Sequence, residues 1–275
     1  MARNAHFGIR DWCLSGGGAF SGGDWGSSLG NVTDPRPQFT ATSVTNGTSD
    51  TRFSVDFGSA KRIGVFHFQN LVVESAATIR LKAGNDPTFA TNLYDSTSVS
   101  AWPSDIIPAG SNYIPGAYEA LGRQRIFVPP AVIGARYINV AIDNHLASTL
   151  TQIGCFCACD VWEPDHNFVY GASWSTVDDS DVQRIPGGTV YVNERQKRRR
   201  VDLGFDALPE DDATGKGFLF SLVHGRSHPV VVVPFPDTAA SLERLSIYGR
   251  STQDGKISNP FLGLYSQTFQ IESEV

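Results

Sequence analysis

The chain has 275 residues, of which 18% are charged, 27 are Gly and one is Met, and its formal net charge is −6. At roughly 150 residues per domain, this length predicts two domains or one large β domain, and the scarcity of strong helix formers argues against a helical protein. The acidic balance gives no basis for bulk nucleic-acid binding, no apolar run approaches the ~18 residues of a membrane span, and the N-terminus lacks a signal peptide's apolar region.

Alternation of apolar and polar residues recurs along the first half of the chain and predicts β-strands. In residues 52–57 it places Phe53, Val55 and Phe57 on one face, and Gly58 is expected to end the run. Short strands separated by Gly, Pro and Asn turns are typical of an antiparallel sandwich or barrel. The other strands predicted in this half are 63–68, 78–83, 125–128, 136–142 and 152–162.

A domain boundary is predicted near Pro164, because proline disfavours the continuation of a central strand. The predicted domains are therefore 1–163 and 164–275, the second long enough for a small β domain. No helix longer than one turn is expected, and residues 242–248 fit either a short helix or a strand. The strands predicted in the second domain are 188–192, 198–205, 218–223, 230–233, 244–248 and 268–271.

Several short motifs follow one another in a consistent order. In the first half they are residues 25–32, 53–58 with 63–66, 85–89 with 94–96, 135–140 with 152–154, and 162–164. This series resembles a discoidin-like (galactose-binding-like) jelly-roll β-sandwich of the kind built into the tail proteins of tailed bacteriophages. Residues 184–191, 197–200, 229–231 and 235–237 are similar to the β domain that follows this module in siphophage tail-tip proteins.

The resemblance implies a structural component of a phage tail tip, of the distal-tail or minor-tail type, located in the virion after synthesis in the bacterial host cytoplasm. Its partners would be tail tube, hub and tape-measure proteins, and its copies would form a trimeric or hexameric ring. The alternative is a carbohydrate-binding module that contacts host cell-surface glycans. The two interpretations are distinguished by whether the sandwich binds a saccharide.

Four cysteines form the sharpest local feature. Cys155, Cys157 and Cys159 alternate along one predicted strand, and Cys13 lies in another strand-like segment. Side chains two steps apart on an extended strand are roughly 6.6–6.8 Å apart, so a straight run fits neither a disulfide between neighbours nor a single zinc. The sequence favours buried reduced thiols. The alternatives are a zinc or iron–sulfur site, and a disulfide from Cys13 in an oxidising compartment.

One dense basic run, Lys197, Arg198, Arg199 and Arg200, lies among strand signals with acidic residues close behind it. A solvated hairpin with interspersed charges is the first interpretation. A subunit interface is the second, because Arg pairs well with carboxylates at contacts. Contact with DNA is the third.

Aromatic residues in loops are the candidate glycan contacts, because ligand sites of sandwich modules are built from loops at one end. The candidates Trp25, Trp102, Tyr113 and Tyr118 lie in stretches rich in Gly, Pro and Ser. The alternative, which the sequence favours, is that they cap the sandwich or pack against neighbouring subunits. No P-loop or metalloprotease motif occurs, and no catalytic residue and no enzyme activity are predicted.

Overall fold

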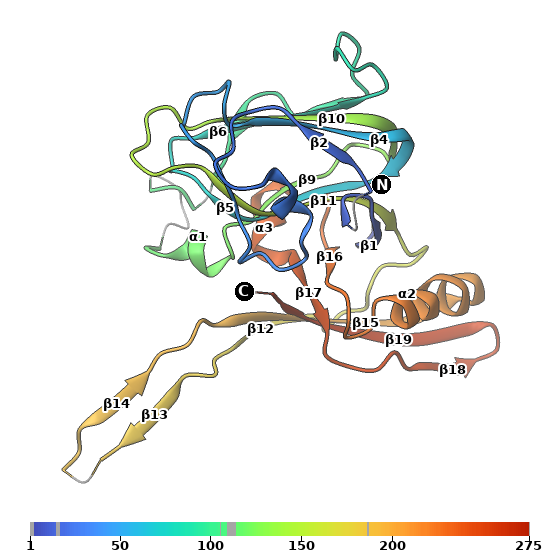
Figure 1. Ribbon diagram of the computed structural model, residues 1–275. Helices are drawn as coiled ribbons and strands as arrows, with labels where there is room; N and C mark the ends of the chain where they lie inside the picture. Colours follow the sequence, from blue (N-terminus) through green and yellow to red (C-terminus); the bar gives the residue numbers. More distant parts are fainter. Residues whose placement is uncertain (1–2, 15–16, 105, 109–113, 186, 275) are drawn as a thin grey trace. The chain divides into compact units, whose positions relative to one another are not determined.

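The computed structural model describes residues 3–14, 17–104, 106–108, 114–185 and 187–274 (Figure 1). The chain forms two compact units, Met1–Glu163 with Val231–Ser246 and Pro164–Val230 with Ile247–Val275. The predicted all-β class is confirmed. None of the helices in the described ranges is long and apolar enough to cross a membrane.

The first unit is a sandwich of two antiparallel sheets. One sheet has the order β16-β1-β11-β5-β9, with β3 beside β11, and the other has the order β2-β4-β10-β6-β7, with β8 beside β6. The strands are β1 (His6–Asp11), β2 (Ala19–Ser21), β3 (Ala41–Thr42), β4 (Arg52–Ile63), β5 (Val65–Val72), β6 (Thr78–Gly84), β7 (Tyr94–Asp95), β8 (Val99–Ser100), β9 (Arg125–Phe127), β10 (Ile133–Asp143), β11 (Gln152–Trp162) and β16 (Val230–Val233). In the described part of this unit, the short α-helices are α1 (Ala117–Ala120) and α3 (Leu242–Leu245).

Aromatic side chains from both sheets meet in the core of the sandwich. The Phe156 ring of β11 packs edge-on against Phe53 of β4, with centroids 5.4 Å apart, and lies 4.7 Å from Phe68 of β5. All three side chains are fully buried. The period-2 pattern that predicts these strands thus gives the inward face of each sheet.

Gly58 does not end its strand, contrary to the prediction. The strand β4 continues to Ile63, and Gly58 has a φ of +72°, which a residue with a side chain rarely adopts. The register of β4 with β10 shifts between Ala135 and Tyr137, so residues 57–60 of β4 interrupt the regular pairing. Glycine here lets the strand change course within the sheet instead of stopping.

The segment Val231–Ser246 belongs to the first unit, whereas the sequence placed it in a second domain. Val232 and Val233 of β16 pair with Phe7 and His6 of β1, and so belong to the same sheet as β1. Further along, Gln124 donates through Nε2 to the backbone oxygens of Glu243 and Ser246. These contacts join residues more than 100 positions apart, which no local sequence pattern reports.

The second unit is built on an antiparallel sheet of order β12-β15-β19-β17, with β18 beside β19. Its core contains Phe205 and Phe269, whose ring centroids are 5.9 Å apart. The strands are β12 (Ser173–Val177), β13 (Asp181–Arg184), β14 (Val190–Asn193), β15 (Arg198–Pro209), β17 (Ile247–Ser251), β18 (Ile257–Phe261) and β19 (Leu264–Ser273). The strands β13 and β14 form a separate two-stranded sheet.

Residues 218–223 form a helix, α2 (Phe218–Val223), and not the predicted strand. A π-helix, Asp211–Gly217, leads directly into it. Periodicity alone does not distinguish a short apolar run in a strand from one in a helix, and here the preceding helical turns decide the outcome. Only Phe220 of α2 is buried, and its ring packs against Phe269 at 5.7 Å.

Candidate functional site

A pocket of about 540 Å³ lies between two loops at one end of the sandwich. One loop follows β5 and leads into β6, and the other joins β10 to β11. The two loops are neighbours because β6 pairs antiparallel with β10, so Thr78 at the start of β6 lies opposite Asp143 at the end of β10. We call this cavity the loop-end pocket.

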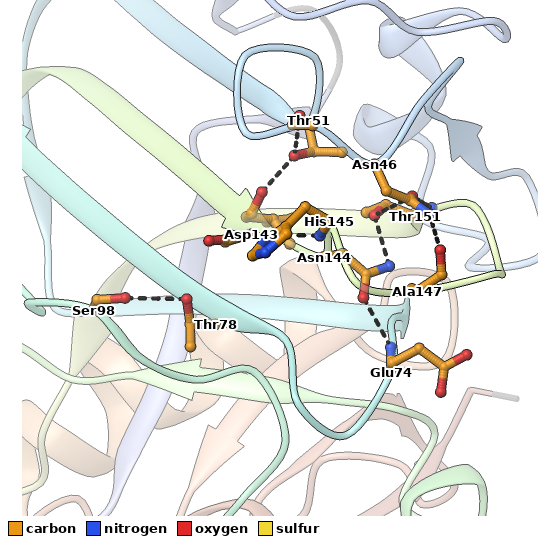
Figure 2. A network of polar contacts seen from close by, with 12 residues as sticks. Asn46, Thr51, Glu74, Thr78, Ser98, Asp143, Asn144, His145, Ala147 and Thr151 are labelled. Carbon is orange, nitrogen blue, oxygen red and sulfur yellow. Dashed lines mark hydrogen bonds and ion pairs between the residues drawn. The ribbon is translucent and has the colours of Figure 1, made fainter.

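The buried side chain of Asn144 ties the two loops together (Figure 2). Its Oδ1 accepts a hydrogen bond from the backbone N–H of Glu74 at 3.2 Å, and its Nδ2 donates to Thr151 Oγ1, also at 3.2 Å. Behind it, Asn46 Oδ1 accepts from the Thr151 N–H at 3.0 Å, and Asn46 Nδ2 donates to the Thr149 carbonyl at 2.9 Å. The backbone around the pocket is therefore fixed by side-chain amides.

The polar groups around the opening are mostly acceptors. Asp143 accepts a hydrogen bond from His145 Nδ1, which keeps the pKa of the Asp143 carboxyl below its usual value. The imidazole is more than half exposed, and this bond leaves its Nε2 facing away from the carboxylate. Glu74 and Ser148 add an exposed carboxylate and an exposed hydroxyl. The described residues that line the pocket include no Lys or Arg, so the site is negatively charged.

The predicted aromatic contacts lie elsewhere, and each of those described is bound to a backbone carbonyl. Trp25 donates through Nε1 to the Arg52 oxygen at 3.3 Å, and Trp102 donates to the Val73 oxygen at 3.0 Å. Tyr118 is 1% exposed and donates to the Leu71 oxygen. The rings of Trp102 and Tyr118 stack at 4.3 Å. Tyr113 lies outside the described residues, and sugar contact by these four residues stays a prediction.

Trp102 nevertheless supports the pocket, because its acceptor Val73 directly precedes Glu74. Trp102→Phe keeps an aromatic ring but leaves the Val73 carbonyl without its donor, and we expect a loss of about 1 kcal/mol in the free energy of unfolding. Trp25→Phe is the matched control, since its indole bond is longer, and its loss should be smaller. Urea unfolding of both variants measures the difference. Equal losses would contradict a specific role for the Trp102 bond.

The three cysteines of β11 are buried on the face opposite Phe156, and Cys13 is buried as well; all four are free thiols. The Sγ atoms of Cys155 and Cys157 are 3.5 Å apart. This is closer than the predicted strand spacing, because side-chain rotation brings the sulfurs together while the backbone keeps its pitch. Among the residues that the structure describes, no group of three or more His, Cys, Asp or Glu is placed to hold a metal ion.

A buried carboxyl lies beside these thiols. Asp11 Oδ1 accepts the backbone N–H of Cys13 at 2.9 Å and that of Ala158 at 3.0 Å. Burial raises the pKa of Asp11 to about 6 despite these bonds and a hydrogen bond from Cys157. Burial also raises the pKa of the Cys13 thiol well above its usual value, which keeps it protonated.

The basic run leads into β15, which begins at Arg198, and its described ion pairs lie inside the second unit. Lys197 pairs with Asp178 at 3.4 Å, Arg198 pairs with Asp179, and Arg200 pairs with Glu272 at 2.7 Å. Arg198 also pairs with Glu272, since alternate residues share a face of the strand. Burial lowers the pKa of the Arg199 guanidinium to about 10. A role of this run in subunit contacts stays a prediction.

Glu74, Asp143 and His145 were not among the candidates from the sequence. The available signal was a polar run, 143–145, placed directly after the most regular alternating strand. Ligand sites tend to lie in such loops. The pairing of β6 with β10, which brings Glu74 to the same place, joins residues about 60 positions apart and has no local signature.

No protein-family model matches the sequence, and no curated protein matches it closely enough to count as a relative. Three solved structures illustrate what the chain is similar to. The glycoside hydrolase SpGH29 is 17% identical at a TM-score of 0.38, with 56% of this chain and 28% of that chain covered. CBM32-1 from a family 31 glycoside hydrolase of Clostridium perfringens is 15% identical at 0.36, with 54% and 96% covered. The lectin domain of lectinolysin, complexed with Lewis B antigen, is 10% identical at 0.38, with 56% and 96% covered. At these TM-scores the similarities assign the chain to no family.

Proposed function

We propose that the first unit binds a carbohydrate in the loop-end pocket. The observation that supports this proposal is a pocket of about 540 Å³ whose open polar groups are mounted on a backbone fixed by Asn144. Small-molecule sites typically measure 300–1,000 Å³, so the volume suits one or two sugar rings. No catalytic role for these residues is part of the proposal.

The chemistry of the lining favours a ligand rich in hydroxyl groups. A carboxylate such as Glu74 or Asp143 only accepts hydrogen bonds, and neighbouring sugar hydroxyls can donate to its two oxygens. His145, oriented by Asp143, presents Nε2 as a further partner. The exposed side chain of Leu146 offers apolar surface for the C–H groups of a ring. Since the described lining has no cation, the site should prefer neutral and amino sugars to acidic ones.

Calorimetric titration of the full chain with a panel of neutral, amino and acidic saccharides tests the proposal. We expect binding of a neutral or amino sugar, and an at least tenfold higher dissociation constant for the corresponding uronic acid. His145→Ala should raise the dissociation constant of the best-binding saccharide by about 10–100-fold. It removes the hydrogen bond from an imidazole that is paired with the Asp143 carboxylate, and hydrogen bonds that involve charged groups are worth about 1.5–3 kcal/mol.

His166→Ala is the matched control, because it removes an exposed imidazole of the second unit. It should bind the saccharide as the unmodified protein does. The proposal fails if no saccharide of the panel binds, or if both alanine variants bind with unchanged affinity.

A structural role in a phage tail tip is the second candidate function. The observation that favours an assembly role is the pair β13–β14, whose strand residues are all exposed although several are apolar. Surfaces of this kind usually mark contacts with other proteins. Copurification with tail tube or hub proteins encoded beside this chain would support the role, and a chain that binds none of them would contradict it.

A further inference from the structure

We call the hairpin of β13 and β14, with Ile185 and Thr189 at its tip, the hairpin arm. Figure 1 shows it projecting beyond β12, with neither strand beside another element of the second unit. A two-stranded hairpin alone is at best marginally stable in water. Its apolar side chains are 48–65% exposed, namely Val182, Ile185, Val190, Tyr191 and Val192. The arm thus has the character of a surface that a partner covers.

The hydrogen bonds at the tip show which backbone groups of the arm are open. The Ile185 N–H donates to the Thr189 carbonyl at 3.1 Å, and Tyr191 lies opposite Gln183. Because hydrogen-bonded and non-hydrogen-bonded pairs alternate in an antiparallel ladder, Tyr191 directs its backbone groups toward β13. Val190 and Val192 therefore direct their N–H and C=O groups toward the outer edge of β14.

The two edges of the arm differ in how well they are protected against pairing. β13 carries Asp181 and Arg184, and charged side chains on an edge oppose the addition of a further strand. β14 reads Val-Tyr-Val-Asn, with no charge, no proline and no bulge. Val, Tyr and β-branched residues in general favour strands. The outer edge of β14 is thus the one suited to accept another strand.

We propose that the outer edge of β14 pairs antiparallel with the same edge of a second copy of this chain, around a two-fold axis at Tyr191. The sequence Val190-Tyr191-Val192 reads the same in both directions, so this register places Val190 opposite Val192 of the other copy, twice. These are the residues with outward N–H and C=O groups, and the pairing makes four backbone hydrogen bonds. Two such identical edges make a closed, isologous contact.

The side chains agree with this register. Val182, Val190 and Val192 share one face of the arm with Arg184, so this face of the four-stranded sheet would carry six valines, with one Arg184 on each outer strand. On the other face the two Tyr191 rings form a non-hydrogen-bonded pair, in which side chains come closest. Thr189 falls opposite Asn193, and no like charges oppose each other. This pairing goes beyond carbohydrate binding and does not depend on it.

Sedimentation equilibrium of the full chain over a range of micromolar concentrations tests the proposal, and we expect a monomer–dimer equilibrium. Val192→Pro removes one outward N–H per copy without touching a bond inside the arm. It should raise the dimer dissociation constant at least about 30-fold, since the symmetry doubles the loss. Val182→Pro is the matched control. Its N–H points to the opposite edge of the arm, and it should dimerise as the unmodified protein does.

Tyr191→Cys provides a second readout that locates the axis. The introduced thiol should form a disulfide between copies under mild oxidation, because Cβ atoms of such a pair lie about 4.5–5.5 Å apart. Gln183→Cys, on the same face but on β13, should not crosslink, since the two positions would be three strands apart. The four natural cysteines are buried. A protein that stays monomeric, an oligomer other than a dimer, or equal effects of Val192→Pro and Val182→Pro would overturn the proposal.

Discussion

Arg125→Met is expected to lower the free energy of unfolding of the first unit by about 3–5 kcal/mol. Arg125 of β9 pairs through Nη1 with Glu243 Oε1 of α3, and Glu243 is only 3% exposed. Burial raises the pKa of Glu243 although Arg125 opposes the shift, so the carboxylate depends on its partner. Removing the guanidinium takes away the charged partner of this buried carboxylate and leaves it only backbone hydrogen bonds, such as those from Glu243 and Ile126. Urea unfolding at neutral pH measures the loss.

The double variant Arg125→Met with Glu243→Met separates loss of charge pairing from loss of packing. Apolar residues of similar volume in place of a buried pair are often neutral or stabilising, so the double variant should recover most of the stability. The loss in Arg125→Met alone should also shrink at acid pH, where Glu243 becomes protonated. If the double variant is as unstable as the single one, the ion pair is not the reason for the loss.

Asp11→Asn is expected to remove a pH-dependent contribution of about 3 kcal/mol to the free energy of unfolding. The folded-state pKa of about 6 lies above the ordinary value of 3.8, so the folded protein binds the proton more tightly than the unfolded chain. The stabilisation by this group is complete below pH ~4 and is lost as the pH rises through about 6. Asparagine keeps an oxygen that accepts from the N–H groups of Cys13 and Ala158 and carries no charge.

Urea unfolding at pH 4.5 and 7.5 checks this result. The variant should gain stability relative to the unmodified protein as the pH rises between these values. Asp56→Asn is the control, because Arg136 lowers the pKa of the half-exposed Asp56, a shift opposite in sign to that of Asp11. The difference in free energy of unfolding between Asp56→Asn and the unmodified protein should change little between pH 4.5 and 7.5. A pH profile of Asp11→Asn parallel to that of the unmodified protein would contradict the buried ionisation.

Local patterns predicted the sandwich strands well, because alternation directly reports which face of a strand is buried. The predicted strand 152–162 coincides with β11, and β10 extends the predicted 136–142 by only a few residues. Alternation is uninformative where neither face of a segment is buried. β13 has no apolar alternation, and all of its residues are exposed. The apolar run of α2 predicts a strand, but most of its residues are exposed on a helix.

The candidate site was harder to predict for a physical reason. Trp102 and Tyr118, two of the candidate glycan contacts, stack on each other and bind backbone carbonyls, and sugar contact by them stays a prediction. The loop-end pocket is formed by residues at strand ends, and its position depends on which strands are neighbours. Strand order is a long-range property, so Glu74 and His145 come together only in the folded sheet.

Hydrogen exchange of the full chain, measured with and without the best-binding neutral or amino saccharide, tests the loop-end pocket most directly. Binding there should slow exchange in the two loops, residues 73–78 and 143–149, and leave the loops that carry Trp25 and the hairpin arm unchanged. Saccharide binding that protects another surface while exchange at residues 143–149 stays the same would contradict the assignment of the site.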